Sequence, residues 1–439
     1  MDFAPSPRAQ DLVLKLDAFM QRYLLPYNAA WHRSVADGIY PPPFLDDLKS
    51  LAREEGLWNL FLPGLQADEP GTRLCNLDYA PLAEAMGRLP WAPEVFNCSA
   101  PDTGNMELLH RFASPVQRKR WLAPLLGGSI RSAFAMTEPD VASSDPTNLH
   151  ATVRREDGQL VLNGRKWFIT GAAHPDCKLL VVMCRNHDSD GHNDIGSDGA
   201  QAQAQAHSRH SMVLVPLDTA GVQVVRNITV LHHHAPEGHC EILLRDVRVP
   251  ADQLLGEWGQ GFAMAQARLG PGRVHHCMRT VGQCELALEL LTERTLERHA
   301  FGHYLSEFSN VQDWIAESRI EIDQARLLVL HAAWLLDLGR ADPARLRAQI
   351  AAIKVVAARL QTRVVDRAMQ AFGAMGLSPD TPLAYFWTWG RALHLMDGPD
   401  EVHLRTVARH ELARSRERTG ATSAWFTTPE QMQAAPRIR

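Results

Sequence analysis

The arrangement of apolar and polar positions divides this chain into a helical region, a strand-rich region and a second helical region. Over the first part, apolar side chains recur close to 3.6-residue spacing, which predicts amphipathic helices. Two such runs are Leu12, Leu14, Leu16, Phe19 and Met20, then Phe44, Leu45, Leu48, Leu51 and Leu57. Prolines at 41–43 mark the entry to the second run. We therefore expect an N-terminal helical domain over residues 1–127.

The pattern changes near Ser129 to short runs rich in Val, Ile, Leu and Thr. In chain order they are SAFAMT, ATVRRE, QLVLNGRKWFIT, KLLVVMCR, SMVLVPL, VQVVRNITVL and CEILLRDVRVP. Gly, Asn, Asp and Pro separate several of them, which is typical of a small antiparallel sheet or barrel. We expect this middle β-domain over residues 128–250. A low-complexity insert at 186–209 cannot bury enough apolar surface to fold alone, so we expect a mobile loop between two strands.

Helical spacing returns from Gly261 onward, in segments such as ELALELLTERTLER and ARLRAQIAAIKVVAARLQTRVVDRAMQAFG. These segments predict long amphipathic helices. The residues from Ser415 onward are polar and predict a tail. We expect a C-terminal helical bundle and tail over residues 251–439. The fold class is therefore α+β, with a β-domain between two helical domains.

Composition narrows the possible classes of protein. A chain of 439 residues with 45% hydrophobic composition is too long for one ordinary core, which indicates two or three subdomains. A net charge of −5 without clustered Lys and Arg argues against nucleic-acid binding. No run approaches the roughly 20 apolar residues of a membrane span, and the N-terminus does not resemble a secretory signal. Seven cysteines without a C-x-x-C pair indicate neither disulfides nor a zinc knuckle, which favours a reducing cytoplasm.

Two segments of the β-region contain residues suited to binding a planar, polar cofactor. Thr137 to Asp145 follows an apolar strand and is dense in hydroxyls and acids, which could hold a ring edge or a pyrophosphate. Composition alone favours a solvated turn there. Trp167 and Phe168 are adjacent aromatics at the end of a strand and could flank a cofactor. Such aromatics are more often part of a core.

Two further segments lie in the helical region. In Arg268 to His276, the sequence Gly-Pro-Gly would let the backbone approach a ligand, and Arg273 could pair with an anion. The alternative is a loop or kink that interrupts a helical region. In Met396 to His403, Pro399 suits the first position of a helix, which places Asp397 on the preceding loop. Asp397 is then either a helix-capping acid, the commoner case, or a carboxylate base.

Other kinds of site lose support. The histidines at 232–234 and 275–276 lack the i, i+4 spacing of metal ligands on a helix, so we expect no metal site. No G-x-G-x-x-G after a strand, no Walker A sequence and no G-x-S-x-G elbow occurs. Nicotinamide-dependent, nucleotide-hydrolysing and serine-hydrolase functions are therefore disfavoured.

Five segments in register resemble the acyl-CoA dehydrogenase family across nearly the whole chain. They are the flavin signature Thr137–Asp145, the N-G-x-K-x-x-I-T-like strand Asn163–Thr170, the D-V-x-V-P segment Asp246–Pro250, the R-x-x-F-G segment Arg298–Gly302, and the Q-x-x-G segment Gln370–Gly373. The match is most similar to the subfamily whose eukaryotic members are fused to a kinase-like domain. The resemblance implies FAD-dependent α,β-dehydrogenation of an acyl-CoA thioester.

The resemblance also implies a role for each matching position. Asp397 inherits the catalytic base, although most of the family has Glu-Gly-Thr where this chain has Asp397-Gly398-Pro399. Some members place the base at the position of Gly272, which cannot act as one. Ala374 and Ser309 also depart from the pattern. Cofactor binding is implied for Phe134, Met136, Thr137, Ser143, Ser144, Trp167, Phe168, Thr170, Arg298, Phe301, Gln370, Gly373, Pro399 and Glu401, and substrate binding for Ser144, Gly270, Gly272, Arg273 and Gly398.

The implied partners are an acyl-CoA substrate, an electron-transfer flavoprotein as acceptor, and further copies of the chain in a homodimer or homotetramer. Neither nucleic acid nor membrane is implied. Two alternatives remain open at this point. One is the processing of 4-phosphorylated hydroxyacyl-CoA, in which α-proton abstraction begins the loss of phosphate and residues near Leu231 and Arg273 receive the phosphate. The other is a flavin-free helical scaffold.

Overall fold

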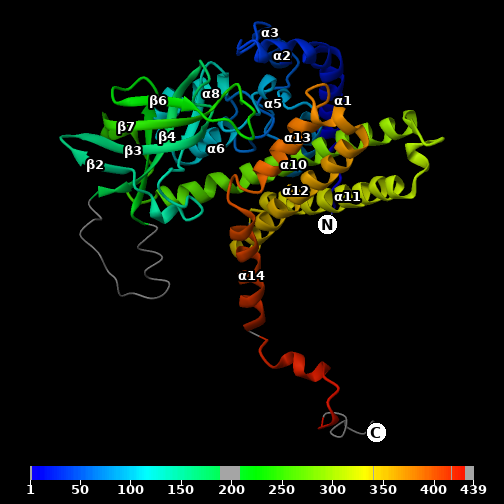
Figure 1. Ribbon diagram of the computed structural model, residues 1–439. Coiled ribbons are helices and arrows are strands. Elements are labelled where there is room, and N and C mark those ends of the chain that lie inside the picture. Colours follow the sequence, from blue (N-terminus) through cyan, green and yellow to red (C-terminus); the bar gives the residue numbers. More distant parts are fainter. Residues whose placement is uncertain (1, 188–207, 340, 417, 431–439) are drawn as a thin grey trace.

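The computed structural model describes residues 2–187, 208–339, 341–416 and 418–430. Figure 1 shows the main β-sheet on one side of the molecule and the long C-terminal helices extending away from it, with the N-terminal helices against both. Most of the insert expected at 186–209 lies outside the described residues.

The N-terminal region is helical, as predicted. Its helices are α1 (Pro7–Phe19), α2 (Asn28–Ala36), α3 (Leu45–Glu54), α4 (Asn76–Gly87), α5 (Ala92–Val95), α6 (Asp102–Phe112), α7 (Pro115–Gln117) and α8 (Ala123–Gly127). Leu16 and Phe19 are buried at helical spacing on α1. Leu14 is 70% exposed, so its assignment to the apolar run was wrong. Two residues along a helix correspond to about 200°, which turns Leu14 away from the face that carries Leu16.

The middle region contains all seven predicted strands. They are β1 (Arg131–Ala135), β2 (Thr152–Glu156), β3 (Gln159–Thr170), β4 (Cys177–Asn186), β5 (His210–Pro216), β6 (Val222–Asn227) and β7 (His239–Pro250). An eighth, β8 (Leu254–Leu255), was too short to predict. The order is β6-β7-β3-β2-β4-β5-β8, with β1 beside β4. Most pairs are antiparallel as expected, but β1 and β2 each pair with β4 in parallel, so the sheet is mixed.

Two of the family-like segments meet inside this sheet. The Asp246 N–H donates to Asn163 Oδ1 at 2.8 Å, and Asn163 Nδ2 donates back to Asp246 Oδ1 at 3.0 Å. Gly164 has a φ of 154°, and a Cβ there would lie 2.4 Å from the Ala151 Cβ. Glycine is therefore required at this irregularity in the β3–β7 pairing.

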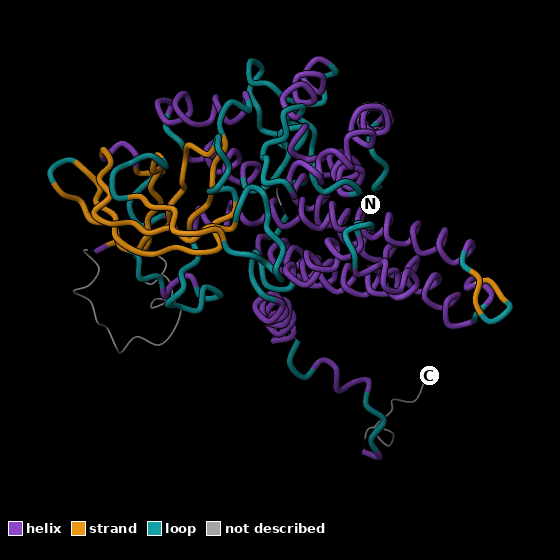
Figure 2. The backbone as a smooth tube through the Cα atoms, turned by 45° about the horizontal axis from the view of Figure 1, so that its top comes forward, coloured by secondary structure: helices purple, strands orange, loops and turns teal. Residues whose placement is uncertain are grey.

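The C-terminal region is a helical bundle. Its helices are α10 (Gly261–Glu297), α11 (Ser309–Asp337), α12 (Pro343–Phe372), α13 (Leu383–Leu393) and α14 (Asp400–Arg416). The short hairpin β9 (His299–Ala300) and β10 (His303–Tyr304) joins α10 to α11. It lies at the end of the bundle that is distant from the main sheet (Figure 2).

The Gly270-Pro271-Gly272 segment is helical, so of the two alternatives of a loop or a kink in residues 268–276 the loop is wrong. Pro271 lies inside the continuous α10. Proline inside a helix costs about 3 kcal/mol. Burial offsets that cost, because each large apolar side chain removed from water contributes about 1.5–3 kcal/mol. Val274, Cys277 and Met278 are buried immediately after the proline.

Within the described ranges, no helix is both long enough and apolar enough to cross a membrane. All seven cysteines are free thiols.

Candidate active site

Asp397 lies on the loop between α13 and α14, where the sequence placed it. The ends of this loop are joined by His394, whose Nδ1 is 2.7 Å from Asp400 Oδ2 and whose carbonyl accepts from the Asp400 N–H at 3.1 Å. Asp397 has a φ of 55° and Gly398 a φ of 100°. A positive φ at a non-glycine residue is uncommon and needs surrounding support. The loop therefore holds Asp397 in a defined conformation.

That support comes from two helices. Arg273 on α10 donates through Nε to the Asp397 carbonyl at 2.8 Å. His403 on α14 lies with Nε2 3.2 Å from the same carbonyl. Because a carbonyl only accepts, His403 must carry its proton on Nε2. A Cβ at Gly398 would lie 3.0 Å from this nitrogen, so the glycine leaves room for it. Of the residues expected to bind substrate, Arg273 and Gly398 thus lie together beside Asp397.

The Asp397 carboxylate points toward α10. Its Oδ2 is 3.5 Å from His276 Nε2, and the side chain remains 24% exposed. Burial alone would raise the pKa of Asp397, but His276, Arg273 and Arg268 together hold the pKa below its usual value. The carboxylate is therefore ionised and accessible, which are the two properties that a general base needs before substrate binds.

Arg268 is a second notable side chain on the same face of α10. Its Nε donates to Asn105 Oδ1 at 2.8 Å, and its guanidinium stacks over the Phe134 ring at 4.1 Å. A Cβ at Gly104 would lie 3.1 Å from the guanidinium carbon, so this glycine on α6 makes room for the cation. Arg268 forms no ion pair with a carboxylate among the described residues, and burial lowers its pKa to about 10. Its charge therefore acts on Asp397, and on Glu107 as well.

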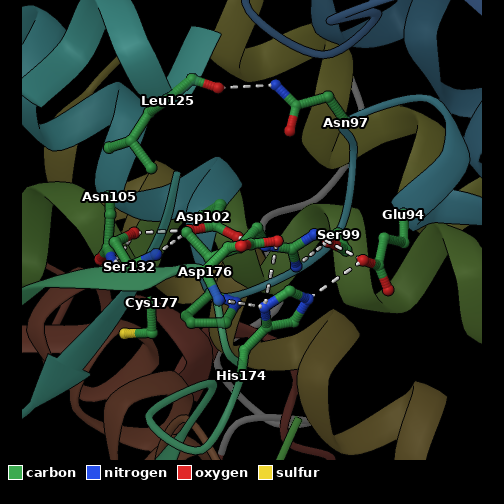
Figure 3. A network of polar contacts seen from close by, with 12 residues as sticks. Glu94, Asn97, Ser99, Asp102, Asn105, Leu125, Ser132, His174, Asp176 and Cys177 are labelled. Carbon is green, nitrogen blue, oxygen red and sulfur yellow. Dashed lines mark hydrogen bonds and ion pairs between the residues drawn. The ribbon is translucent and has the colours of Figure 1, made fainter. Parts of the chain in front are cut away.

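A buried polar network fixes Asn105 and so Arg268. Asn105 Nδ2 donates to Ser132 Oγ at 2.9 Å, and the Ser132 N–H and hydroxyl both donate to Asp102 Oδ1 at 2.6 Å. Figure 3 shows these three side chains clustered together, with Glu94 and His174 farther along the same network. The network joins α6 to the first strand of the sheet, so the N-terminal helices and the β-domain hold Arg268 in common.

The sheet presents the expected aromatic pair at an irregularity. The register of β3 against β7 shifts between Lys166 and Ile169, and Phe168 has a φ of 51°. Trp167 is held from the signature loop, because its N–H donates to the Thr137 carbonyl at 3.0 Å and its carbonyl accepts from Thr137 Oγ1 at 2.5 Å. Both aromatic side chains are left partly exposed. The Thr137 loop and this aromatic pair thus form one surface.

A buried ion pair supports the surface formed by the Thr137 loop and the aromatic pair. Glu138 accepts from Lys166 Nζ at 2.7 Å and from the backbone N–H groups of His150 and Ala151 at 2.7 and 3.0 Å. Lys166 also donates to the Met136 carbonyl at 3.0 Å. A buried ion pair with further hydrogen bonds is rigid, and removal of one partner is strongly destabilising. The Glu138 carboxylate therefore positions the signature loop and does not face a ligand.

The residues at the end of β3 fit a flavin. Thr170 Oγ1 lies 2.9 Å from His239 Nδ1, and the His239 ring lies 5.5 Å from the Trp389 ring on α13. His239 Nε2 is buried without a hydrogen-bond partner among the described residues. Burial lowers the pKa of His239 to about 4, so the ring is neutral. A planar ring system with polar edges matches this combination of aromatic faces, a hydroxyl and an unpaired buried nitrogen.

Four residues assigned to the cofactor lie elsewhere. Arg298 and Phe301 are at the distal hairpin, and Gln370 and Gly373 are exposed at the C-terminal end of α12. These two groups are neighbours, because Arg294 stacks over the Phe372 ring at 5.1 Å. The single chain thus brings the two groups together but leaves them apart from Asp397. Glu401 is exposed on α14, Pro399 directly precedes that helix, Ser144 is exposed and Ser143 lies against the Glu138 N–H.

Some residues near Asp397 were missed from the sequence: Arg268, His276 and His403 had been given no role in catalysis. The signal was present, since Arg268, Gly272 and His276 are spaced four residues apart and share one face of a helix. The interpretation of Gly-Pro-Gly as a loop concealed that face. Within the described part of the chain, no group of three potential ligands for a metal ion occurs.

The fold and both halves of the site agree with comparisons to known families. Residues 133–247 match the family described as "Acyl-CoA dehydrogenase, middle domain", and residues 259–412 match "Acyl-CoA dehydrogenase, C-terminal domain". The chain belongs to the acyl-CoA dehydrogenase family, whose members are flavin-dependent oxidoreductases.

Particular relatives refine this assignment. The chain is 50% identical to "Probable acyl-CoA dehydrogenase FadE2" of Mycobacterium tuberculosis, over 95% of this chain and 98% of that protein. It is 48% identical to mouse "Acyl-CoA dehydrogenase family member 10", over 93% of this chain but 37% of that longer protein. A solved putative acyl-CoA dehydrogenase from Mycobacterium abscessus has 47% identity and a TM-score of 0.86, over 94% of this chain and 99% of that one. The eukaryotic relative thus extends well beyond the region shared with this chain.

A more distant neighbour, described as the FAD complex of PigA, has a TM-score of 0.79 at 23% identity, over 94% of this chain. It shares the fold.

Proposed function

We propose that the protein binds FAD and dehydrogenates an acyl-CoA thioester between its α- and β-carbons, with Asp397 as the general base. The observation that carries the proposal is the way in which the backbone and the side chain of Asp397 are held. Two helices hold its backbone carbonyl, while its carboxylate stays ionised and accessible. A residue that served only to cap α14 would have no need of this arrangement.

Asp397 takes the α-proton on a carboxylate oxygen. A bound acyl chain displaces water from the site, which raises the pKa of the carboxylate and improves the base. The backbone N–H groups of Asp397 and Gly398 donate to no other backbone group among the described residues. They are therefore free to donate to the thioester oxygen and stabilise the negative charge that develops there. Aspartate is one methylene shorter than glutamate, so the substrate must approach about 1–1.5 Å closer.

FAD supplies the hydride acceptor when it is bound. We assign its ring to the surface formed by Thr137, Trp167, Phe168 and Thr170, with Phe134, Met136 and Ser143 in support. A purified protein with flavin absorbance near 450 nm, lost on denaturation and recovered with added FAD, is the expected result. A folded protein that neither contains nor takes up FAD would contradict the proposal and favour the flavin-free scaffold.

The acyl chain is assigned to the face of α10 that carries Gly272, which lies four residues from both Arg268 and His276. A Cβ at Gly272 would meet no atom within 4 Å. Gly270 lies about 200° around the helix from Gly272, and a Cβ there would meet Ile350 of α12 at 3.8 Å. The helix surface at Gly272 is therefore uncovered by side chains. Replacement of Gly272 by Leu should fill the space, raise the KM for acyl-CoA and leave FAD content unchanged.

A second candidate substrate is a 4-phosphorylated hydroxyacyl-CoA. Arg268 favours it, because this partly buried cation has no carboxylate partner among the described residues and acts on Asp397. A guanidinium is well suited to bind phosphate through paired N–H groups. Incubation with both substrate types, with assays for free phosphate and for flavin reduction, distinguishes the two. Phosphate release that disappears in Arg268→Met would support the second candidate.

We also propose that the protein assembles as a homodimer or homotetramer and passes electrons to an electron-transfer flavoprotein. The assembly would place the distal group (Arg298, Phe301, Gln370 and Gly373) against a neighbouring copy. This proposal is supported by the position of these residues and by Phe301, which is 96% exposed. Large exposed aromatics of this kind are enriched at interfaces.

A further inference from the structure

His276 lies between a cation and the proposed base. Its Nε2 is 3.5 Å from Asp397 Oδ2, and its Nδ1 is 3.2 Å from Arg279 Nη2. His276 and Arg279 are three residues apart on α10, so both project from one side of the helix. The His276 side chain is 27% exposed, which leaves it within reach of the same space as Asp397.

The contact with Arg279 fixes the tautomer of His276. A guanidinium only donates, so His276 Nδ1 must be the acceptor in this contact. A neutral imidazole with an unprotonated Nδ1 carries its proton on Nε2. The Nε2–H is then the atom that faces the Asp397 carboxylate.

Arg279 is itself fixed in place. A Cβ at Gly87 on α4 would lie 2.2 Å from the Arg279 carbonyl, so only glycine permits the two helices to approach this closely. Arg279 Nη1 also points to the Cys98 carbonyl, at 3.4 Å. The Arg279 guanidinium that contacts the His276 ring is thus held in place by the close packing of α10 against α4.

His276 is uncharged at neutral pH. Burial, and then the Arg279 charge, lower the pKa of His276 to about 4. A neutral N–H donor stabilises a carboxylate less than a cation does, so it can orient the base without removing much of its basicity. The other charged or titratable groups that face this pair come from three helices, and are Arg268, Arg273, Lys354 and His403.

We propose that His276 is a positioning residue, which uses its Nε2–H to orient the Asp397 carboxylate for proton abstraction, with its tautomer set by Arg279. The inference rests on the proposed function, in which Asp397 is the base. The distance of 3.5 Å is long for a hydrogen bond, as expected of a catalytic contact that tightens when substrate binds.

The test uses the full-length holoenzyme and two substitutions of His276. His276→Leu removes the donor at similar volume, whereas His276→Gln keeps an N–H close to the position of Nε2. Anaerobic flavin bleaching at 450 nm after mixing with butyryl-CoA or a longer acyl-CoA gives the rate constant. We expect a fall of roughly 10- to 100-fold for His276→Leu, because a misplacement of about 1 Å can cost 10²-fold. We expect His276→Gln to recover most of that loss.

A second readout separates positioning from packing. Loss of a donor to the charged carboxylate raises its pKa, so the acid limb of the bleaching rate against pH should move to higher pH in His276→Leu and return in His276→Gln. Substrate affinity and FAD content should change little in either variant. His275→Leu is the matched control, because His275 is the adjacent buried histidine and packs against Tyr79, away from Asp397.

The outcomes are distinguishable. Wild-type rates and an unmoved acid limb in His276→Leu would overturn the inference, as would equal losses in the Leu and Gln variants. If Asp397→Asn bleaches at the wild-type rate, the proposed function fails and the inference fails with it. If Asp397→Asn is inactive and His276→Leu is normal, the inference alone is overturned.

Discussion

The two ends of α10 differ in how many of their side chains are in contact with other parts of the same chain. Near the first end, Arg268, Arg273 and His276 each contact a residue from another element. At the other end, Phe301 follows the helix and is 96% exposed. Both ends carry segments that resemble family motifs, so the difference does not follow from the motifs themselves.

The difference indicates that one end of α10 is completed by folding of the chain and the other by association between copies of it. The surroundings of the proposed base are built by folding, since α10 and α14 both contact the Asp397 carbonyl. In addition, α6 holds Arg268, and Lys354 of α12 donates to the Leu393 carbonyl at the end of α13. In the described part of the chain Phe301 at the distal end is left 96% exposed, and contacts that cover it would come from association. Changes near Asp397 should therefore alter chemistry within each protomer. Changes near Phe301 should alter oligomeric state and, through it, FAD retention.

The largest expected effect is that of Asp397→Asn on the chemical step. The amide has nearly the same shape as the carboxylate and cannot accept the α-proton, and loss of a general base typically costs about 10²–10⁴-fold in rate. FAD content and acyl-CoA binding should remain. Anaerobic flavin bleaching at 450 nm measures the step directly.

The alternative role of Asp397 makes the opposite prediction. Asparagine caps helices as well as aspartate does, so a residue that only capped α14 would tolerate the change. Wild-type bleaching rates in Asp397→Asn would remove this residue from the mechanism. The end of α10 near Asp397 would then have a structural role only.

The next effect is on stability in acid. At the end of α10 near Asp397, two buried histidines should contribute to it. Burial lowers the pKa of His403 to about 4 and that of His275 to about 3. The unfolded chain takes up a proton near pH 6.5. Above pH 6.5 both the folded and the unfolded states are neutral at these histidines, whereas protonation of the unfolded chain progressively destabilises the fold as the pH falls from 6.5 toward 4. Between pH 6.5 and 5 each should cost about 2 kcal/mol.

Thermal unfolding between pH 7 and pH 5 measures this loss. His403→Gln removes one titrating group, so its melting temperature should depend less on pH than that of the wild type. His303→Gln is the matched control, because His303 is exposed on the distal hairpin. The comparison between the two ends of α10 fails if His303→Gln flattens the pH dependence as much as His403→Gln does.

Sequence patterns predicted much of the fold and less of the site. Apolar spacing located α1 and α3, and short β-branched runs located β1 to β7, because burial of one face imposes a period on the sequence. The pattern failed at Leu14, since polar and apolar residues are both tolerated on an exposed face. It also failed to indicate the parallel pairing of β1 with β4, which joins segments about 45 residues apart through tertiary packing rather than local preference.

The site could be predicted at Asp397 but not around it. Pro399 and the acids after it indicate a helix start, and hence a loop that presents Asp397. The contacts of Arg273 and His403 with the Asp397 carbonyl depend on how three helices pack. Local preference was misleading at Gly270 to Gly272, where packing maintains a helix through a proline.

A smaller effect is expected from Phe301→Ser at the distal end. If Phe301 packs against a neighbouring copy, its loss removes about 1.5–3 kcal/mol from that contact. We expect dissociation at higher protein concentration by analytical ultracentrifugation, and FAD affinity weaker by about 10-fold, which corresponds to about 1.4 kcal/mol. At saturating FAD the bleaching rate should equal that of the wild type.

Leu14→Ser is the matched control for Phe301→Ser, because Leu14 is also a large exposed apolar residue, at 70% exposure, but lies on α1. It should change neither the oligomeric state nor FAD affinity. Unchanged mass and FAD affinity in Phe301→Ser would show that the distal end is simply a solvated hairpin. The proposed difference between the two ends of α10 would then be lost.

The smallest effect should follow replacement of residues 188–207 by a short Gly-Ser linker. The described flanks already meet, since Arg185 pairs with His210 in the ladder between β4 and β5 and the Asn186 N–H donates to the Arg209 carbonyl at 2.7 Å. A short connection can therefore join the two strands without moving them.

The energetic argument for this deletion concerns loop closure. The closure cost grows only with the logarithm of loop length, by about 0.6 kcal/mol per doubling, so shortening the connection from about 20 residues to about 4 should stabilise the fold by about 1.4 kcal/mol. Melting temperature, FAD content and bleaching rate are the three measurements, and all should stay within error of the wild type or rise slightly.

The deletion should change neither the chemistry near Asp397 nor the association at the distal hairpin. Loss of FAD with retained folding would place the insert at the cofactor, and a change in mass would place it at the interface between copies. Either result would mean that a segment outside α10 contributes to cofactor binding or to association, which the comparison of the two ends of α10 leaves out.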